Sequence, residues 1–384
     1  MWVPMSPVIL RDCLAAPRAA RQLPGGNAMT ETKPTRLVWM DLLRIFCIFT
    51  VIIIHVSGPL MEQTFKVGST AWQQTNALAS CVRFSVPVLV MISGAFFLDP
   101  NRPCPGKKLF GQKLVRVLTA WLLWSVVYAA VMWGRRGYNV LQGETVGKIF
   151  DSAFRENYFH LWFLPMIAGL YLTVPLLRKI TADEKATKYF IAVGFVADFI
   201  FAQLPKIEPI RPYVYDLVKN ASLFFFYGFS VFFAAGYYFT HYEVRPWLRR
   251  LLYALAVCSC IVTACVTADL SLKKGELDAS AYASLLPNTA VTSFAVFLFF
   301  KNVVSKIRWS DRAARGIAKV SAWSFGVYLV HVLVREFMVK NLGITGVEHS
   351  PLWFIPVSAL GVFLVSLLLS VILNHIPFLR KYIV

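Results

Sequence analysis

Acidic residues are scarce in this chain of 384 residues. It has 20 Asp and Glu against 39 Lys and Arg, and charged residues make up only 15% of the sequence. A soluble domain carries charge on about 25% of its residues, whereas 57% of this chain is hydrophobic. The composition therefore excludes a soluble globule and indicates a membrane protein.

Cysteine is also sparse, and its spacing lacks the signature of a zinc site. None of the seven cysteines forms a CxxC pair, and the nearest two, Cys258 and Cys260, have one residue between them. Structural zinc sites need cysteine pairs with about two to four intervening residues. We therefore expect no metal centre.

Long apolar segments dominate the sequence, and ten of them are candidate membrane spans. Several approach the ~20 residues that a helix needs to cross the hydrocarbon core. The shortest, 160–177 and 189–204, are the weakest candidates. The ten segments are 37–57, 74–98, 113–133, 160–177, 189–204, 221–240, 248–268, 281–300, 320–340 and 351–373.

The basic residues are distributed unequally between the loops. With the N-terminus inside, the inner segments hold 24 Lys and Arg with 7 acidic residues, and the outer loops hold 10 of each. The positive-inside rule then favours an even number of spans. We predict an all-α polytopic membrane protein with about ten transmembrane helices and both termini cytoplasmic. The net charge of +19 is explained by this topology and by anionic membrane lipids, so we expect no nucleic-acid partner.

Three regions follow from this pattern. Residues 1–36 are rich in Pro, Arg and Ala without clear periodicity, which predicts a disordered cytoplasmic segment. Met29 is a possible true start, because the codons for Gly25 and Gly26 can form a ribosome-binding sequence upstream of it. Residues 37–376 form the membrane domain, and 377–384 form a short cytoplasmic tail.

The first span carries three polar side chains that the membrane would otherwise disfavour. Arg44 and His55 are eleven residues apart, about 20° beyond three full turns, and Asp41 lies about 60° to the other side. All three share one helix face. Ionisable residues at membrane depth turn toward other helices or a wet cavity, so this face is a candidate functional site.

Three further polar residues in the spans have competing interpretations. Arg83 in the second span is either an ion-pair partner of Asp41 or a contact for a substrate or cofactor. His160 is either an interfacial anchor or a partner of His55, because both fall at the outer ends of their spans. His331 lies four residues before Arg335, which favours a local structural network over a catalytic role.

Four basic residues cluster near the inner end of the third span. Lys107, Lys108, Lys113 and Arg116 occur within ten residues of one another. They either extend to lipid phosphates or bind a phosphorylated cofactor.

The motif MDLLRIFCIFTVIIIH in the first span is followed by RFSVPVLVMISGAFFL, KLVR, HLWFLP and SFGVYLVH. In these motifs and in their order the chain resembles the integral-membrane acyltransferase 3 family. These motifs cover about residues 36–375. The chain departs from the pattern at Lys113, where family members often carry Arg.

The resemblance implies an O-acyltransferase that moves acetyl from cytoplasmic acetyl-CoA to a hydroxyl of an envelope glycan or lipid-linked sugar. It places the protein in the bacterial cytoplasmic (inner) membrane. Lys107, Lys108, Lys113 and Arg116 would contact CoA, and Arg44 and Arg83 would orient the thioester and stabilise the oxyanion. Asp41 would hold Arg44, and His160 would lie beside the catalytic centre. His55 would be either the general base or a transient acyl carrier.

Two alternatives remain open from the sequence. A secondary transporter also places Arg, His and Asp within its spans, although the two halves of this chain show no internal repeat. A second alternative is transfer of succinyl or a longer acyl group to glucans or antibiotics.

Overall fold

The computed structural model describes residues 37–101, 106, 109–155, 158–206, 211–220 and 228–383. Within these residues every regular element is a helix, which confirms the predicted fold class. The predicted N-terminal segment 1–36 lies outside the described residues. The α-helices are α2 (Val38–Pro59), α3 (Thr70–Cys81), α4 (Ser85–Phe97), α6 (Val115–Arg135), α7 (Gly143–Arg155), α8 (Phe163–Thr181), α9 (Glu184–Gly194), α10 (Arg211–Asn220), α11 (Ser230–His241), α12 (Pro246–Lys274), α13 (Pro287–Asn302), α14 (Asp311–Leu342), α15 (Pro351–His375) and α16 (Pro377–Tyr382). The π-helices are η1 (Leu60–Thr64), η2 (Leu109–Leu114) and η3 (Phe195–Ile200), and the 3-10 helices are η4 (Phe201–Lys206), η6 (Ser280–Tyr282) and η7 (Val304–Lys306).

The described part of the chain contains nine helical segments that are long and apolar enough to cross a membrane. They correspond to nine of the ten predicted spans, including the two shortest ones, since Phe163–Thr181 and Glu184–Pro205 both qualify. The tenth prediction, 221–240, lies partly outside the described residues. Its described part is α11, a helix of 12 residues that packs against α4 and α9.

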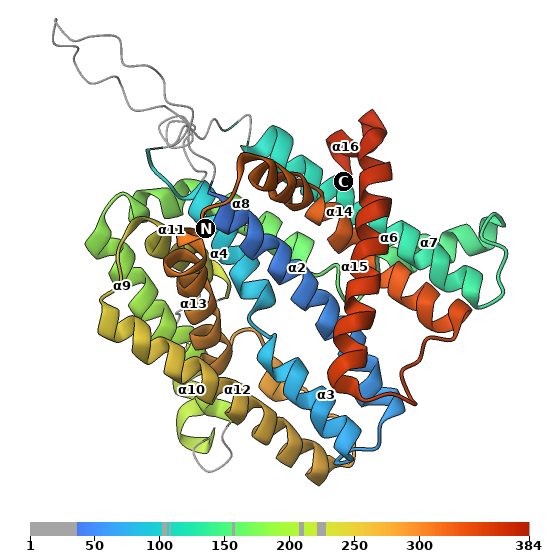
Figure 1. Ribbon diagram of the computed structural model, residues 1–384, viewed down its shortest axis with the longest axis horizontal. Coiled ribbons are helices and arrows are strands. Elements are labelled where there is room, and N and C mark those ends of the chain that lie inside the picture. Colours follow the sequence, from blue (N-terminus) through green and yellow to red (C-terminus); the bar gives the residue numbers. More distant parts are fainter. Residues whose placement is uncertain are drawn as a thin grey trace, which may run out of the picture.

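The two ends of the membrane domain lie on the same side of the helix bundle. Both the start of α2 and the end of α15 lie toward the top of Figure 1. Contacts along α14 agree with this view, because Arg44 of α2 donates to Ser321 and Ser370 of α15 donates to the Trp323 carbonyl. We call this the Asp41 side. The opposite side, where α2 ends beyond His55, is the His55 side.

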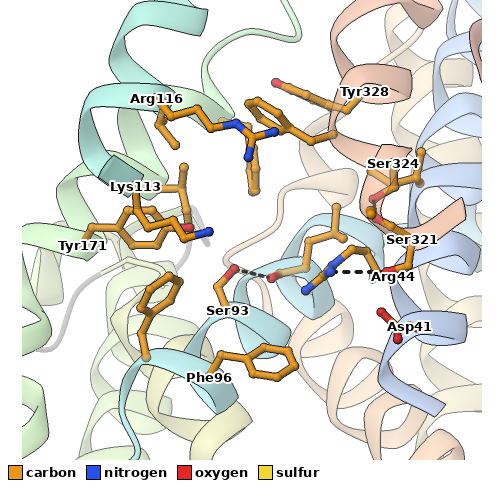
Figure 2. A pocket seen from close by; sticks show the side chains of 18 of the residues that line it. Asp41, Arg44, Ser93, Phe96, Lys113, Arg116, Tyr171, Ser321, Ser324 and Tyr328 are labelled. Carbon is orange, nitrogen blue, oxygen red and sulfur yellow. Dashed lines mark hydrogen bonds between the residues drawn. The ribbon is translucent and has the colours of Figure 1, made fainter. Parts of the chain in front are cut away.

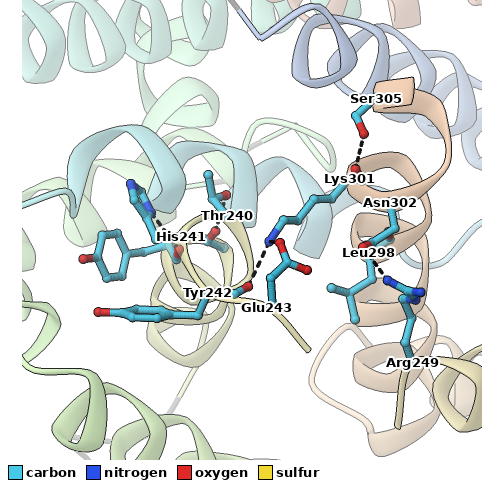
Figure 3. A network of polar contacts seen from close by, with 11 residues as sticks. Thr240, His241, Tyr242, Glu243, Arg249, Leu298, Lys301, Asn302 and Ser305 are labelled. Carbon is cyan, nitrogen blue, oxygen red and sulfur yellow. Dashed lines mark hydrogen bonds and ion pairs between the residues drawn. The ribbon is translucent and has the colours of Figure 1, made fainter. Parts of the chain in front are cut away.

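A polar network fixes three helix ends on the Asp41 side (Figure 3). The Lys301 ammonium group at the end of α13 donates to the Tyr242 carbonyl at 2.8 Å and pairs with Glu243 at 2.9 Å. Arg249 in the first turn of α12 donates to the Asn302 side chain at 2.5 Å. The ends of α11, α12 and α13 are therefore held together.

Two glycines bring α4 and α11 into backbone contact. A Cβ atom at Gly94 would overlap the carbonyl of Phe233, and one at Gly236 would overlap the carbonyl of Met91. A glycine within an apolar span lets a neighbouring helix approach closely, and Gly94 has this role here. This crossing holds the buried helix α11 against the helix that contributes Ser93 and Phe96 to the candidate site.

The second span is broken into α3 and α4 by the turn at residues 82–84. The Ser85 hydroxyl lies 2.5 Å from the Val82 carbonyl oxygen and 2.7 Å from Thr50 Oγ1 of α2. These side-chain contacts supply polar partners where the helical backbone is interrupted. Arg83 lies at this break.

Helix α14 carries a stripe of polar and aromatic residues along α2. Ser321, Ser324, Tyr328, His331 and Arg335 follow one another at alternating intervals of three and four residues, so they share one helix face. Ser321 contacts Arg44, the His331 ring lies 5.2 Å from the His55 ring, and Arg335 contacts the His55 carbonyl. The polar stripes of α2 and α14 therefore face each other.

Candidate functional site

A cavity of about 690 Å³ opens between α2, α4, α6, α8 and α14. Along α2 its lining extends from Leu37 to Ile48, a rise of about 16 Å. Its volume lies within the range of about 300–1,000 Å³ that is usual for small-molecule sites. The polar lining residues, shown in Figure 2, are Asp41, Arg44, Ser93, Lys113, Arg116, Tyr171, Ser321, Ser324 and Tyr328.

Cations outnumber carboxylates in this lining. Arg44, Lys113 and Arg116 reach the cavity from two helices, whereas Asp41 is the one acidic residue in the lining. Figure 2 shows Lys113 and Arg116 on the α6 side of the cavity and Arg44 on the α2 side. An apolar cavity with excess positive charge suits an anionic ligand that has a long uncharged part.

Local structure and packing orient these cations. Lys113 lies in the π-helix η2 directly before α6, and Arg116 follows three residues later on the same face. The Arg44 Nη1 atom donates to Ser321 Oγ at 3.3 Å, and its guanidinium carbon lies 5.9 Å from the centre of the Phe96 ring. The other two predicted cofactor contacts, Lys107 and Lys108, lie outside the described residues.

A cluster of three histidines lies farther along α2, toward the His55 side. The ring centroids are 5.2 Å apart for His55 and His331, 5.3 Å for His160 and His331, and 6.3 Å for His55 and His160. His160 is 2% exposed and His331 is fully buried. The predicted proximity of His55 and His160 is present, and the unexpected feature is His331 between them.

The hydrogen bonding of His331 identifies its basic nitrogen. Nδ1 lies 2.6 Å from the Tyr328 carbonyl oxygen, which can only accept, so this nitrogen carries the proton. Nε2 is left as an acceptor, and it is buried without a hydrogen-bond partner in the described part of the chain. A buried, oriented lone pair next to His55 is the arrangement that proton transfer or imidazolium stabilisation requires.

Arg335 contacts a different helix from the one that its position in the sequence indicated. Its spacing from His331 suggested a local network on one helix, but its Nη1 atom donates across to the His55 carbonyl at 3.3 Å. It therefore ties α14 to the end of α2, on the opposite side of His331 from Tyr328.

Tyr328 separates the cavity from the histidine cluster. It lines the cavity, its hydroxyl donates to the His160 carbonyl at 2.6 Å, and its ring centroid lies 6.0 Å from that of His331. None of the three histidines is among the cavity-lining residues. The polar face of α2 therefore has two parts. Asp41 and Arg44 line the cavity, and His55 belongs to the histidine cluster outside it.

Arg83 does not line the cavity, but it lies within electrostatic range of His55. Its Nε atom donates to the Ala79 carbonyl at 3.0 Å, and its guanidinium carbon lies 3.5 Å from the centre of the Tyr282 ring. Tyr282 in turn donates to the Asn76 side chain at 2.6 Å. The contacts described for Arg83 are those with Ala79 and Tyr282, whereas Asp41 belongs to the cavity lining, which Arg83 does not share.

Sequence reasoning did not single out Tyr328, and it did not place His331 beside His55 and His160. A signal was present in SFGVYLVH, because Ser324, Tyr328 and His331 fall on one helical face. The helical spacing of these residues does not show which neighbouring helix this face packs against. For metals, the described residues contain no group of three His, Cys, Asp or Glu side chains that could hold an ion.

The comparisons with known proteins identify a family. The model of the acyltransferase 3 family, described as an acyltransferase domain, matches residues 37–374, which is nearly the whole chain. No curated protein and no solved structure matches the chain.

Proposed function

Because the chain belongs to the acyltransferase 3 family, we propose that it is a membrane-embedded O-acetyltransferase acting on a cell-envelope glycan. The acetyl donor is acetyl-CoA and the acceptor is a hydroxyl of the glycan or of its lipid-linked precursor. In this proposal it resembles the stand-alone O-acetyltransferase of enterobacterial common antigen. The observation that carries the proposal is the cationic cavity ending at Tyr328, directly beside the three-histidine cluster.

The cavity is the proposed donor site. Lys113 and Arg116 bind phosphate groups of CoA, and the pantetheine arm follows the apolar wall of α2 toward Tyr328. Arg44 lies eleven residues, or about 16 Å of helix rise, from His55. We therefore assign Arg44, positioned by Asp41 and Ser321, to donor binding rather than to the oxyanion of a carbonyl at His55.

The histidine cluster is the proposed catalytic centre, at the boundary that Tyr328 forms. His55 accepts the proton of the acceptor hydroxyl, and the hydroxyl oxygen attacks the thioester carbonyl carbon. The tetrahedral intermediate collapses with cleavage of the carbon–sulfur bond, and the CoA thiolate takes the proton from the His55 imidazolium, which regenerates the base. His331 Nε2 accepts a hydrogen bond from the imidazolium of His55, and His160 packs beside both rings.

The proposed orientation follows the charge distribution. The Asp41 side faces the cytoplasm, where acetyl-CoA is found, and the His55 side faces outward. Labelling of a cysteine introduced at the exposed residue Gln63 tests this orientation. In intact cells the Gln63→Cys variant should react with a membrane-impermeant maleimide added outside, and reaction only after lysis would contradict it.

The function is tested with purified protein in nanodiscs and acetyl-CoA labelled in the acetyl group. We expect transfer of label to envelope glycan extracted from the cell that makes the protein, and loss of transfer in His55→Ala. Uptake of a solute with the thioester left intact would instead indicate a transporter. Trapping of acetyl on His55 would indicate a covalent acyl carrier in place of a general base.

A further inference from the structure

The His55 side of the catalytic cluster has an exposed aromatic ring. Phe159 is 52% exposed, and its ring centroid lies 5.2 Å from that of His55 and 5.1 Å from that of Tyr158. The segment that carries it precedes α8 and is anchored because Tyr128 stacks on Tyr158 at 4.5 Å. A large apolar ring that remains exposed beside the half-buried His55 offers a flat surface for stacking against the apolar face of a sugar ring.

Cations lie close to the same aromatic segment. Arg135 pairs with the buried carboxylate of Glu336, which also receives the Tyr158 hydroxyl. This arrangement fixes Tyr158 beside Phe159 and neutralises Arg135.

Two further cations lie beyond this pair. Arg335 donates to the His55 carbonyl, and Lys340 lies within electrostatic range of Arg135 and Arg335. Among the described residues neither Arg335 nor Lys340 forms an ion pair, and the one carboxylate that interacts with Arg335 over a longer range is the exposed Glu62. The surroundings of His55 and Phe159 therefore keep excess positive charge.

We propose that Phe159, Arg335 and Lys340 form the acceptor subsite, and that the acceptor is a sugar bearing an anionic group close to the acetylated hydroxyl. This inference rests on the proposed function. The sugar ring stacks on Phe159, the hydroxyl points to His55, and the anion binds Arg335 and Lys340. Both a phosphate of a lipid-linked sugar and a carboxylate of a uronic acid have this chemistry.

Binding to matched charged and neutral probes tests the subsite. The full chain in nanodiscs is titrated calorimetrically with a galacturonic acid trisaccharide and with its methyl ester, which lacks only the charge. A second arm compares nanodiscs containing decaprenyl phosphate with nanodiscs containing decaprenol by the melting temperature of the protein. We expect at least tenfold tighter binding of the free acid, or stabilisation by the phosphate, and the responding arm identifies the source of the anion.

Variants connect the binding to the named residues. Arg335→Gln and Lys340→Gln should each weaken the charged probe at least threefold without changing binding of acetyl-CoA, and Phe159→Leu should weaken charged and neutral trisaccharide alike. Lys273→Gln, which removes an exposed cation at the distant end of α12, is the matched control and should change nothing.

The outcomes separate this subsite from the proposed function. Three results would overturn the subsite. They are equal affinity for the charged and neutral probes, no response in either arm, and unchanged binding in the Arg335 and Lys340 variants. These measurements need no acetyl transfer. Probe binding that depends on Arg335, in a protein that transfers no acetyl group, would therefore refute the acetyltransferase while leaving the anion subsite in place.

Discussion

His331 offers the sharpest test of the chemistry, because its two nitrogens have different roles. His331→Asn keeps a side-chain amide that can donate to the Tyr328 carbonyl but removes the acceptor Nε2. A hydrogen bond to a charged group contributes about 1.5–3 kcal/mol. At about 1.4 kcal/mol per factor of ten in rate, losing that bond to the His55 imidazolium should lower kcat about 10- to 150-fold.

The assay is steady-state transfer from labelled acetyl-CoA by the purified variant. KM for acetyl-CoA should stay within twofold of the wild-type value, because His331 does not line the donor cavity. The melting temperature should also be retained. His331→Gln is the matched control, because it supplies an acceptor oxygen near the position of Nε2 and loses the bond to Tyr328. It should recover part of kcat at a lower melting temperature. Retention of more than half of the wild-type kcat by His331→Asn would refute the assigned role.

Three other predictions follow from the geometry. His55→Ala should reduce transfer at least ~10²-fold while leaving acetyl-CoA binding intact, because it removes the base and not the donor site. Lys113→Gln and Arg116→Gln should each raise KM for acetyl-CoA about 10- to 150-fold at low salt, from the loss of one charge-assisted phosphate contact, and the effect should shrink as salt rises. Gly94→Ala should destabilise the protein by about 1–3 kcal/mol, measured as a lower melting temperature, because its Cβ overlaps the backbone of α11.

Each of these predictions has a control. The control Lys185→Gln changes an exposed lysine on the Asp41 side and should leave KM for acetyl-CoA unchanged. An equal rise of KM in this variant would show that general surface charge is responsible. Gly169→Ala has open space around the new methyl group, so it should melt as the wild type does. More than a tenth of wild-type transfer in His55→Ala would remove His55 from the mechanism.

The helical spacing of the residues predicted the polar face of α2. It did not predict that this face is divided between the cavity and the histidine cluster. Asp41, Arg44 and His55 share one face, as their spacing indicated. Whether they meet one ligand depends on what α14 places opposite them. Tyr328 occupies that position. It lies more than 270 residues after the polar residues of α2 in the chain, so no local pattern in α2 specifies it.

Arg83 illustrates the same limit for a buried charge. Its position within an apolar segment indicated that it needed a partner, and the structure supplies Tyr282 and the Ala79 carbonyl. The partner could not be identified because Tyr282 lies about 200 residues later in the chain, in a short 3-10 helix before α13. In contrast, Lys113 and Arg116 were predictable, since both their charge and their helical spacing are local.

Transfer of acetyl across the membrane is the most direct test of the claim that the donor cavity and the histidine cluster lie on opposite sides of Tyr328. Protein is reconstituted with one orientation in sealed vesicles that enclose envelope glycan, and labelled acetyl-CoA is added to the Asp41 side only. The account predicts label on the enclosed glycan at the His55 side, and none with His55→Ala. Label confined to glycan added on the Asp41 side would contradict the placement of donor and acceptor on opposite sides of Tyr328.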